Sequence, residues 1–173
     1  MTIVVGALTM FLAGCSMLSP CKPGKPGKPK PYDVTVNLDQ SLQQGSVVVD
    51  LIAANPTDLP RWEAYSLNTY WKEGDPRRTE ADKVTFSFVS GQTLTNSLGK
   101  TDPKWTKWMA QGATHLVVLA DLPGGRVDKP GTQDERRQIL PLDPCHWPKK
   151  TAGLMVQVQR SGIRVLTPPR PAK

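Results

Sequence analysis

A succession of short apolar segments, separated by loops rich in proline and glycine, constrains the fold of this chain more than any other feature. From Tyr32 to Asp39 apolar and polar residues alternate strictly, which is typical of a half-buried β-strand. The run from His115 to Leu119 is almost continuously apolar and has the length of a fully buried strand. By similar patterns we expect further strands at 46–54, 62–71, 83–90, 137–142, 153–159 and 163–166.

One short helix is expected among these strands. Asp102-Pro103 has the form of an N-cap followed by proline at the first helical position, and Trp105, Trp108 and Met109 then share one face at helical spacing. No strand-helix-strand alternation indicates a doubly wound sheet. About eight strands with one short helix predict an all-β fold, an immunoglobulin-like β-sandwich.

The amino-terminal residues do not fit the strand pattern. An uncharged apolar run, 3–12, leads into Leu12-Ala13-Gly14-Cys15, which resembles the lipobox of bacterial lipoprotein signal peptides. The run is too short to cross a bilayer of about 30 Å as a helix, so a cleaved signal peptide over residues 1–14 explains it better than a permanent span. Cys15 would then carry lipid, diacylglycerol and palmitate, at the new amino terminus. The alternative, a buried segment with Cys15 as a core thiol, does not account for the spacer that follows.

Residues 15–31 predict a tether. The segment 22–31 repeats Lys-Pro-Gly, offers no apolar side chains to bury and carries mutually repelling lysines, so we expect a semi-extended, solvated spacer. A single globular domain at 32–167 and a flexible tail at 168–173 complete the chain. Ser16, rather than an acidic residue, follows the lipidated cysteine and fits the usual pattern for retention at the periplasmic face of the outer membrane.

The positive charge is concentrated in the tether. The formal net charge is +7, with 22 lysines and arginines against 15 acidic residues. Four of the lysines lie between positions 22 and 30, and the rest of the chain has a net charge of only +3. The basicity therefore indicates a tether near anionic lipid or glycan, and we expect no nucleic-acid partner.

The three cysteines are an odd number, which calls for an explanation in an exported protein. If Cys15 carries lipid, Cys21 and Cys145 remain. An oxidising periplasm allows these two to pair, and the bond would fix the base of the tether to the domain. The alternative, which the sequence leaves equally open, is that Cys145 is a free thiol.

Motifs for catalysis or metal binding are missing from the sequence. We find no phosphate-binding loop, no His-Glu-x-x-His and no Gly-x-Ser-x-Gly. His115 is expected to be a satisfied core histidine, and His146, beside Cys145, has no ligand spacing for zinc. Acidic residues around the glycines of the 121–135 loop alternate with arginines and lysines, which favours a solvated loop over a calcium site. We predict no enzyme activity, no cofactor and no metal.

The five tryptophans, at positions 62, 71, 105, 108 and 147, are many for a domain of this size. Most should pack in the core or at its rim. If one cluster is exposed as a binding surface, Trp105 and Trp108 beside Pro103 are the candidates.

Several blocks in order resemble TssJ, the outer-membrane lipoprotein family of type VI secretion systems. After the lipobox and spacer, Asn55-Pro56 precedes the alternating Tyr65-Ser66-Leu67 segment, and the apolar run 112–120 is similar to the family's buried strand. An arginine-bearing strand near Arg136 and Arg137 and a final pair, 154–158 with 163–166, follow.

The resemblance implies a transthyretin-like, non-enzymatic β-sandwich. Such a protein anchors the trans-envelope complex to the outer membrane and binds the periplasmic domain of an inner-membrane secretion-complex protein, chiefly through the loop between its first two strands. That loop is either Asp39–Gly45 or Asn55–Arg61, depending on register. The candidate contacts for the partner are Asn55, Pro56, Thr57 and Asp58, together with Trp105 and Trp108.

Two functions remain open. The first is a lipid-anchored structural adaptor whose loops dock another envelope protein. The second is a periplasmic or surface lipoprotein that binds or hydrolyses carbohydrate, which a concave site with convergent carboxylates and stacked tryptophans would support.

Overall fold

The computed structural model describes Cys21 and residues 26–171. The predicted signal peptide, residues 1–14, and the predicted lipidation site, Cys15, lie outside the described residues. No helix within the described part of the chain has both the length and the apolar character needed to cross a membrane.

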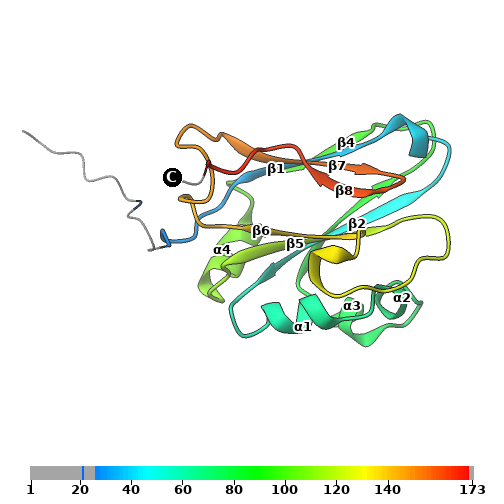
Figure 1. The fold of residues 1–173 in the computed structure, drawn as a ribbon, viewed down its shortest axis with the longest axis horizontal. Coiled ribbons are helices and arrows are strands. Elements are labelled where there is room, and N and C mark those ends of the chain that lie inside the picture. Colours follow the sequence, from blue (N-terminus) through cyan, green and yellow to red (C-terminus); the bar gives the residue numbers. More distant parts are fainter. Residues whose placement is uncertain (1–20, 22–25, 172–173) are drawn as a thin grey trace, which may run out of the picture.

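Two four-stranded sheets pack face to face (Figure 1). The first has the order β4-β1-β7-β8 and the second β3-β2-β5-β6. The strands are β1 Asp33–Leu38, β2 Val47–Ala54, β3 Lys83–Phe88, β4 Thr95–Leu98, β5 His115–Asp121, β6 Arg137–Pro141, β7 Gly153–Gln159 and β8 Gly162–Val165. All pairs described are antiparallel except β1 with β7, which run parallel from Asp33↔Gly153 to Leu38↔Val158. The prediction of an all-β sandwich is confirmed.

The main core fills the space between the sheets. Alternation along β1 sends Val34, Val36 and Leu38 inward, where each is at most 6% exposed. Their neighbours come from both sheets, and Trp105, Trp108 and Trp147 close the sides of this cluster. Burial of so many aliphatic and aromatic side chains is the dominant stabilising contribution.

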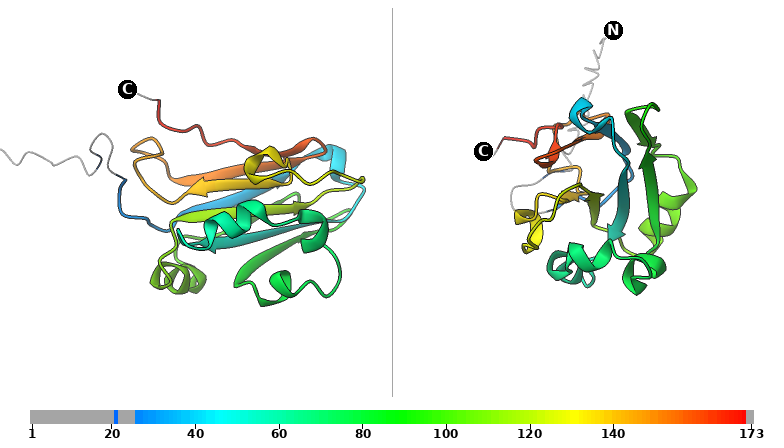
Figure 2. Two further views of the ribbon diagram at one scale, coloured as in Figure 1. Left: turned by 60° about the horizontal axis from the view of Figure 1, so that its bottom comes forward. Right: turned by 90° about the vertical axis from the view of Figure 1, so that its right-hand side faces the viewer.

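The continuous apolar run in β5 is explained by a second, smaller core. Leu116 and Val118 face the space between the sheets, whereas Val117 and Leu119 face outward and pack with Trp62 and Tyr70. Helices cover this outer face of the second sheet (Figures 1 and 2). They are α1 Leu59–Ala64, α2 Leu67–Tyr70 and α3 Pro76–Glu80.

The prediction of a strand at 62–71 is wrong, because this range forms α1 and α2. Pro60 stands in the first turn of α1, and Ser66 caps α2 by accepting a hydrogen bond from the backbone N–H of Thr69 at 3.1 Å. An extended residue, Tyr65, separates the two short helices. The residues that face inward therefore do not follow one helical period across 62–71. The strand β4 and the helix α3 were not predicted, whereas α4, Pro103–Ala110, begins after Asp102 as expected.

The described part of the tether lies against the domain. Gly27 donates its N–H to Asp143 Oδ1 at 2.8 Å, and Lys30 donates its N–H to the carbonyl of Leu142 at 3.1 Å. A Cβ on Gly27 would approach the Asp143 carboxylate to 2.7 Å, so only glycine fits this contact. Cys21 and Cys145 form a disulfide across the same junction. Residues 27–30 of the predicted spacer thus contact the domain, while the side chains of Lys28 and Lys30 remain exposed.

Candidate functional site

The connection between the first two strands lies at the end of the domain remote from the tether (Figure 1). It contains a 3-10 turn, η1 Gln40–Leu42, and Asp39 accepts a hydrogen bond from the N–H of Ser41 at 2.9 Å. The loop between the first two strands is thus Asp39–Gly45. We call it the docking loop, after the role that the TssJ resemblance implies for it.

The other candidate range, Asn55–Arg61, joins β2 to α1 at the tether end of the domain. Asn55 Oδ1 accepts hydrogen bonds from the N–H groups of Thr57 and Asp58, both at 2.9 Å, and so forms the turn that starts the helix. The predicted contacts Asn55, Pro56, Thr57 and Asp58 therefore lie outside the docking loop.

The proposal that Trp105 and Trp108 form an exposed binding surface is wrong. Both side chains are 1% exposed and meet edge to face, with ring centroids 5.1 Å apart. The helix α4 turns them toward the main core, and Trp108 Nε1 donates to the carbonyl of Asp82 at 3.0 Å. The expectation that most tryptophans pack in the core is confirmed, since Trp62 and Trp147 are also buried.

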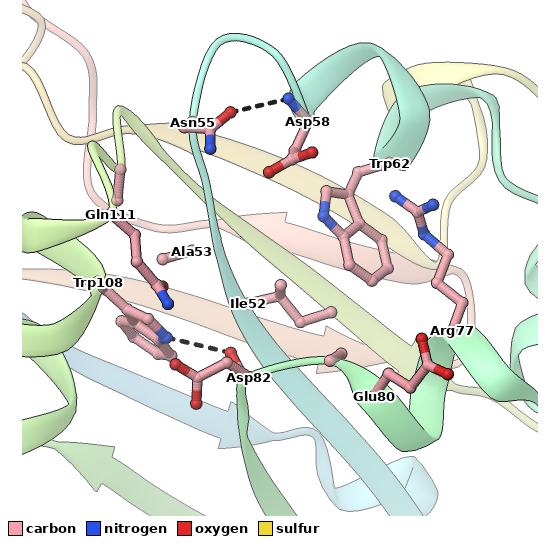
Figure 3. Close-up of a pocket in the computed structure, with 12 residues that line it drawn as sticks. Ile52, Ala53, Asn55, Asp58, Trp62, Arg77, Glu80, Asp82, Trp108 and Gln111 are labelled. Carbon is pink, nitrogen blue, oxygen red and sulfur yellow. Dashed lines mark hydrogen bonds between the residues drawn. The ribbon is translucent and has the colours of Figure 1, made fainter.

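A cavity of about 520 Å³ opens beside the end of β2 (Figure 3). Pairing of β2 with β3 stops at Ile52, whereas pairing with β5 continues to Ala54, so the last two residues of β2 have a strand neighbour on one side only. The cavity occupies this open edge, between α1, the end of α3 and α4. Its walls carry the side chains of Asp58, Trp62, Arg77, Glu80, Asp82 and Trp108, among others.

The polar groups of the cavity are largely engaged with one another or with nearby lysines. The Arg77 guanidinium lies 4.1 Å from the ring centroid of Trp62 and covers that indole. Asp82 pairs with Lys104 at 2.6 Å and with Lys107 at 3.2 Å. Burial alone would raise the pKa of Asp82, but these two lysines outweigh it and hold the pKa below its usual value. Neither indole of the cavity thus offers an open face for a sugar ring, and Asp82 is held in its ionised form, which does not suit a general acid.

The long loop after β5 is largely exposed, as expected of a solvated loop, but it is anchored at its end through buried charges. The Arg136 guanidinium binds both carboxylate oxygens of Asp134, at 2.9 and 2.7 Å, and also Asp128 at 2.8 Å and Asn68 at 2.7 Å. The side chains of Arg136 and Asp134 are 6% and 1% exposed. Burial raises the pKa of Asp134 and Asp128, but hydrogen bonds, chiefly from Arg136 to Asp134 and from Ser66 to Asp128, outweigh it and hold both pKa values below the usual range.

The neighbouring Arg137 is fully buried and ties the loop region to the helices. Its guanidinium donates to the backbone carbonyls of Glu63 and Tyr65, at the end of α1. Burial lowers the pKa of Arg137. The sequence placed these arginines on a strand but gave no sign that they enter the protein interior.

The histidines and acidic residues do not assemble into a catalytic or metal centre within the described ranges. His115 lies partly buried at the start of β5, with Nδ1 3.0 Å from Thr114 Oγ1, and burial lowers its pKa. This environment fits the expected core histidine. In residues 26–171 and at Cys21, no group of three or more metal-ligating side chains is arranged to hold an ion.

Comparison with known proteins gives structural matches and no sequence matches. No protein-family model and no curated protein matches the chain. A chain of a type VI membrane complex superposes with a TM-score of 0.50 at 12% identity, covering 80% of this chain and 98% of that one. The chain is TssJ-like in fold.

Two further matches have lower TM-scores. Lip from Serratia marcescens, a membrane-bound component of the type VI secretion system, matches with a TM-score of 0.49 at 14% identity, over 81% of this chain and 99% of that one. The type VI secretion lipoprotein TssJ1 from Pseudomonas aeruginosa matches with a TM-score of 0.45 at 15% identity, over 84% and 99%. The likeness to the type VI membrane-complex chain, at 12% identity, establishes the fold alone, and function has to be argued from the chain's own residues.

Proposed function

We propose that this TssJ-like protein is an outer-membrane lipoprotein, anchored through Cys15, that acts as a structural adaptor of a type VI secretion trans-envelope complex. The observation that carries the proposal is the match of the sandwich to nearly the whole of a chain from a type VI membrane complex. The lipobox that ends at Cys15 and the Lys-Pro-Gly tether support it independently, because they supply the anchor and the spacer that such an adaptor needs.

The partner in this proposal is the periplasmic domain of an inner-membrane protein of the same complex. The docking loop is suited to reach it, because the loop lies at the end of the domain opposite the point where the membrane tether enters. A surface at the tether end would instead face the membrane that holds the anchor.

A loop replacement tests this assignment. In the full-length protein, the exposed Ser41, Gln43 and Gln44 of the docking loop are each replaced by glycine, which keeps the buried Leu42 in place, and as a matched control Pro56 and Thr57, both exposed, are replaced by Gly-Ser. We expect copurification with the partner's periplasmic domain to be lost only in the first variant. Loss in the control alone, or in neither variant, would contradict the proposed docking loop.

The carbohydrate alternative finds less support in the geometry. The cavity brings carboxylates and tryptophans together, as that alternative requires, but Trp62 is covered by Arg77 and Trp108 is 1% exposed. Among its lining residues, Asp82 is neutralised by two lysines. We therefore propose no enzyme activity for this site.

A further inference from the structure

Val127 is the most exposed of the large hydrophobic residues in the described part of the chain. Its side chain is 80% exposed, against 46% for Val89, 44% for Met155 and 40% for Leu166. A single exposed valine is common on protein surfaces and needs no explanation by itself. What sets Val127 apart is that the residues on both sides of it are fixed by hydrogen bonds.

Arg126, on the amino-terminal side, is held at its backbone and at its side chain. Its carbonyl accepts a hydrogen bond from Asn68 Nδ2 at 2.9 Å, and its guanidinium donates to the carbonyl of Arg160 in the turn between β7 and β8. These contacts connect the loop to the helical layer on one side and to the first sheet on the other.

Asp128, on the carboxy-terminal side, is held even more firmly. Its carboxylate accepts from Ser66 Oγ at 2.5 Å, from the N–H of Asn68 at 3.0 Å and from the buried Arg136 at 2.8 Å. Val127 is therefore displayed on a backbone whose position is set from both ends.

The same contacts extend to the docking loop. Arg160 Nε donates to the carbonyl of Ser41 at 3.2 Å, so the docking loop, the β7–β8 turn and the segment around Val127 are joined in series. Figures 1 and 2 show the three segments at the same end of the domain, opposite the tether.

The charges next to Val127 favour an acidic partner surface. The nearby Lys129 is paired with Glu135 at 2.8 Å, and Asp128 is paired with Arg136. Arg126 and Arg160, by contrast, use their guanidinium groups on backbone carbonyls and make no ion pair among the described residues. Two arginines without an acidic partner in the described part of the chain thus belong to the segments that adjoin Val127.

We infer that Val127, with Arg126 and Arg160 beside it, is a second contact point of the docking surface, and that it enters an apolar pocket with an acidic rim on the partner's periplasmic domain. The inference rests on the proposed function, since it names a further part of the surface that binds the same partner. An apolar side chain held on a fixed backbone loses little conformational entropy when it is covered, and such pre-organisation lowers the cost of binding.

The test measures the affinity of the full-length protein, in detergent, for the purified periplasmic domain of the inner-membrane partner. Val127→Asp removes the apolar contact and places a negative charge opposite the acidic rim. Met155→Asp is the matched control, because Met155 is also an exposed apolar residue but lies on β7, paired in register with Thr35, away from the docking loop. Val127→Leu keeps the apolar character.

We expect Val127→Asp to weaken binding by at least about tenfold, the factor that corresponds to losing the burial of one aliphatic side chain. Val127→Leu and Met155→Asp should bind within about threefold of the unmodified protein, a difference below 1 kcal/mol. If the unmodified protein binds and Val127→Asp binds equally well, the inference is overturned while the proposed function stands. If both aspartate variants lose the same affinity, the effect is not specific to Val127 and the inference fails. If the unmodified protein does not bind, the proposed function fails, and the inference fails with it.

Discussion

Replacement of Arg136 by methionine should destabilise the domain strongly, because it leaves the buried carboxylate of Asp134 without its cation. In the native protein the guanidinium makes two hydrogen bonds to Asp134, at 2.9 and 2.7 Å, and one to Asp128 at 2.8 Å. The Asp134 side chain is 1% exposed, so water cannot replace the lost partner. Removing one member of a buried ion pair typically costs about 3–5 kcal/mol. For a domain of this size that lowers the melting temperature by roughly 10–20 °C.

The loss of stability in Arg136→Met should depend on pH, and the direction of this dependence follows from the pKa of Asp134. The folded protein holds the pKa of Asp134 below its usual value, so the ionised form contributes stability above about pH 4, and this contribution is lost as the pH falls through the lowered pKa. Without the Arg136 guanidinium, burial is opposed only by the backbone N–H groups of residues 129 and 136, so the neutral acid becomes more favourable. The stability difference between Arg136→Met and the unmodified protein should therefore be largest near neutral pH and shrink as the pH approaches about 4.

Urea denaturation followed by circular dichroism, at neutral and acidic pH, measures both effects. Lys129→Met is the control, because it removes an ion pair of the same loop whose members, Lys129 and Glu135, are 45% and 41% exposed. An exposed pair contributes at most about 1 kcal/mol. A loss for Arg136→Met no larger than that of the control, or one that does not change with pH, would refute the reasoning.

Three further predictions concern the anchor, the disulfide and the core. Cys15→Ser should move the protein from the membrane fraction to the soluble periplasmic fraction and abolish palmitate labelling; retention in the membrane would show another anchor. Cys145→Ser should lower the free energy of unfolding by up to about 4–5 kcal/mol, since the disulfide closes a loop with a sequence separation of 124 residues, and adding reductant to the unmodified protein should have the same effect. Trp105→Ala should cost about 3–5 kcal/mol in chemical denaturation, as expected for a residue that is 1% exposed in the main core, whereas a binding-surface role would leave stability nearly unchanged.

Strict alternation was the most reliable sequence signal in this chain. It identified β1, β3 and β7, where one face is buried and the other is not, and the apolar run identified β5. The same signal failed at residues 62–71 because two helices of six and four residues are too short to display a helical period. The strand β4, with the sequence Thr-Asn-Ser-Leu, carries only one fully buried residue and therefore left no pattern to recognise.

The arrangement of the candidate sites depended on contacts that the sequence does not display. The sequence indicated that the charges of Asp128, Asp134 and Arg136 neutralise one another, but it did not indicate a buried network. The burial depends on α2, which is distant in sequence and contributes Asn68 to the network. The position of the docking loop followed from strand order, which local patterns do not determine. Likewise, the connection between Val127 and that loop is visible only in three dimensions. It runs from Arg126 to Arg160 and from Arg160 to Ser41.

The parallel pairing of β1 with β7 has a mechanical consequence for a domain attached at its amino terminus. β1 follows the tether directly and lies inside its sheet, bonded to β4 along one edge and to β7 along the other. A pulling force on the tether is shared between the chain that leads into β1 and the Cys21–Cys145 disulfide, which passes part of the force to the segment between β6 and β7. The hydrogen bonds on both edges would then be loaded together in shear, and they could not be peeled apart one by one. The end of the domain that the tether enters is therefore held both by a covalent bond and by the two strand pairings of β1.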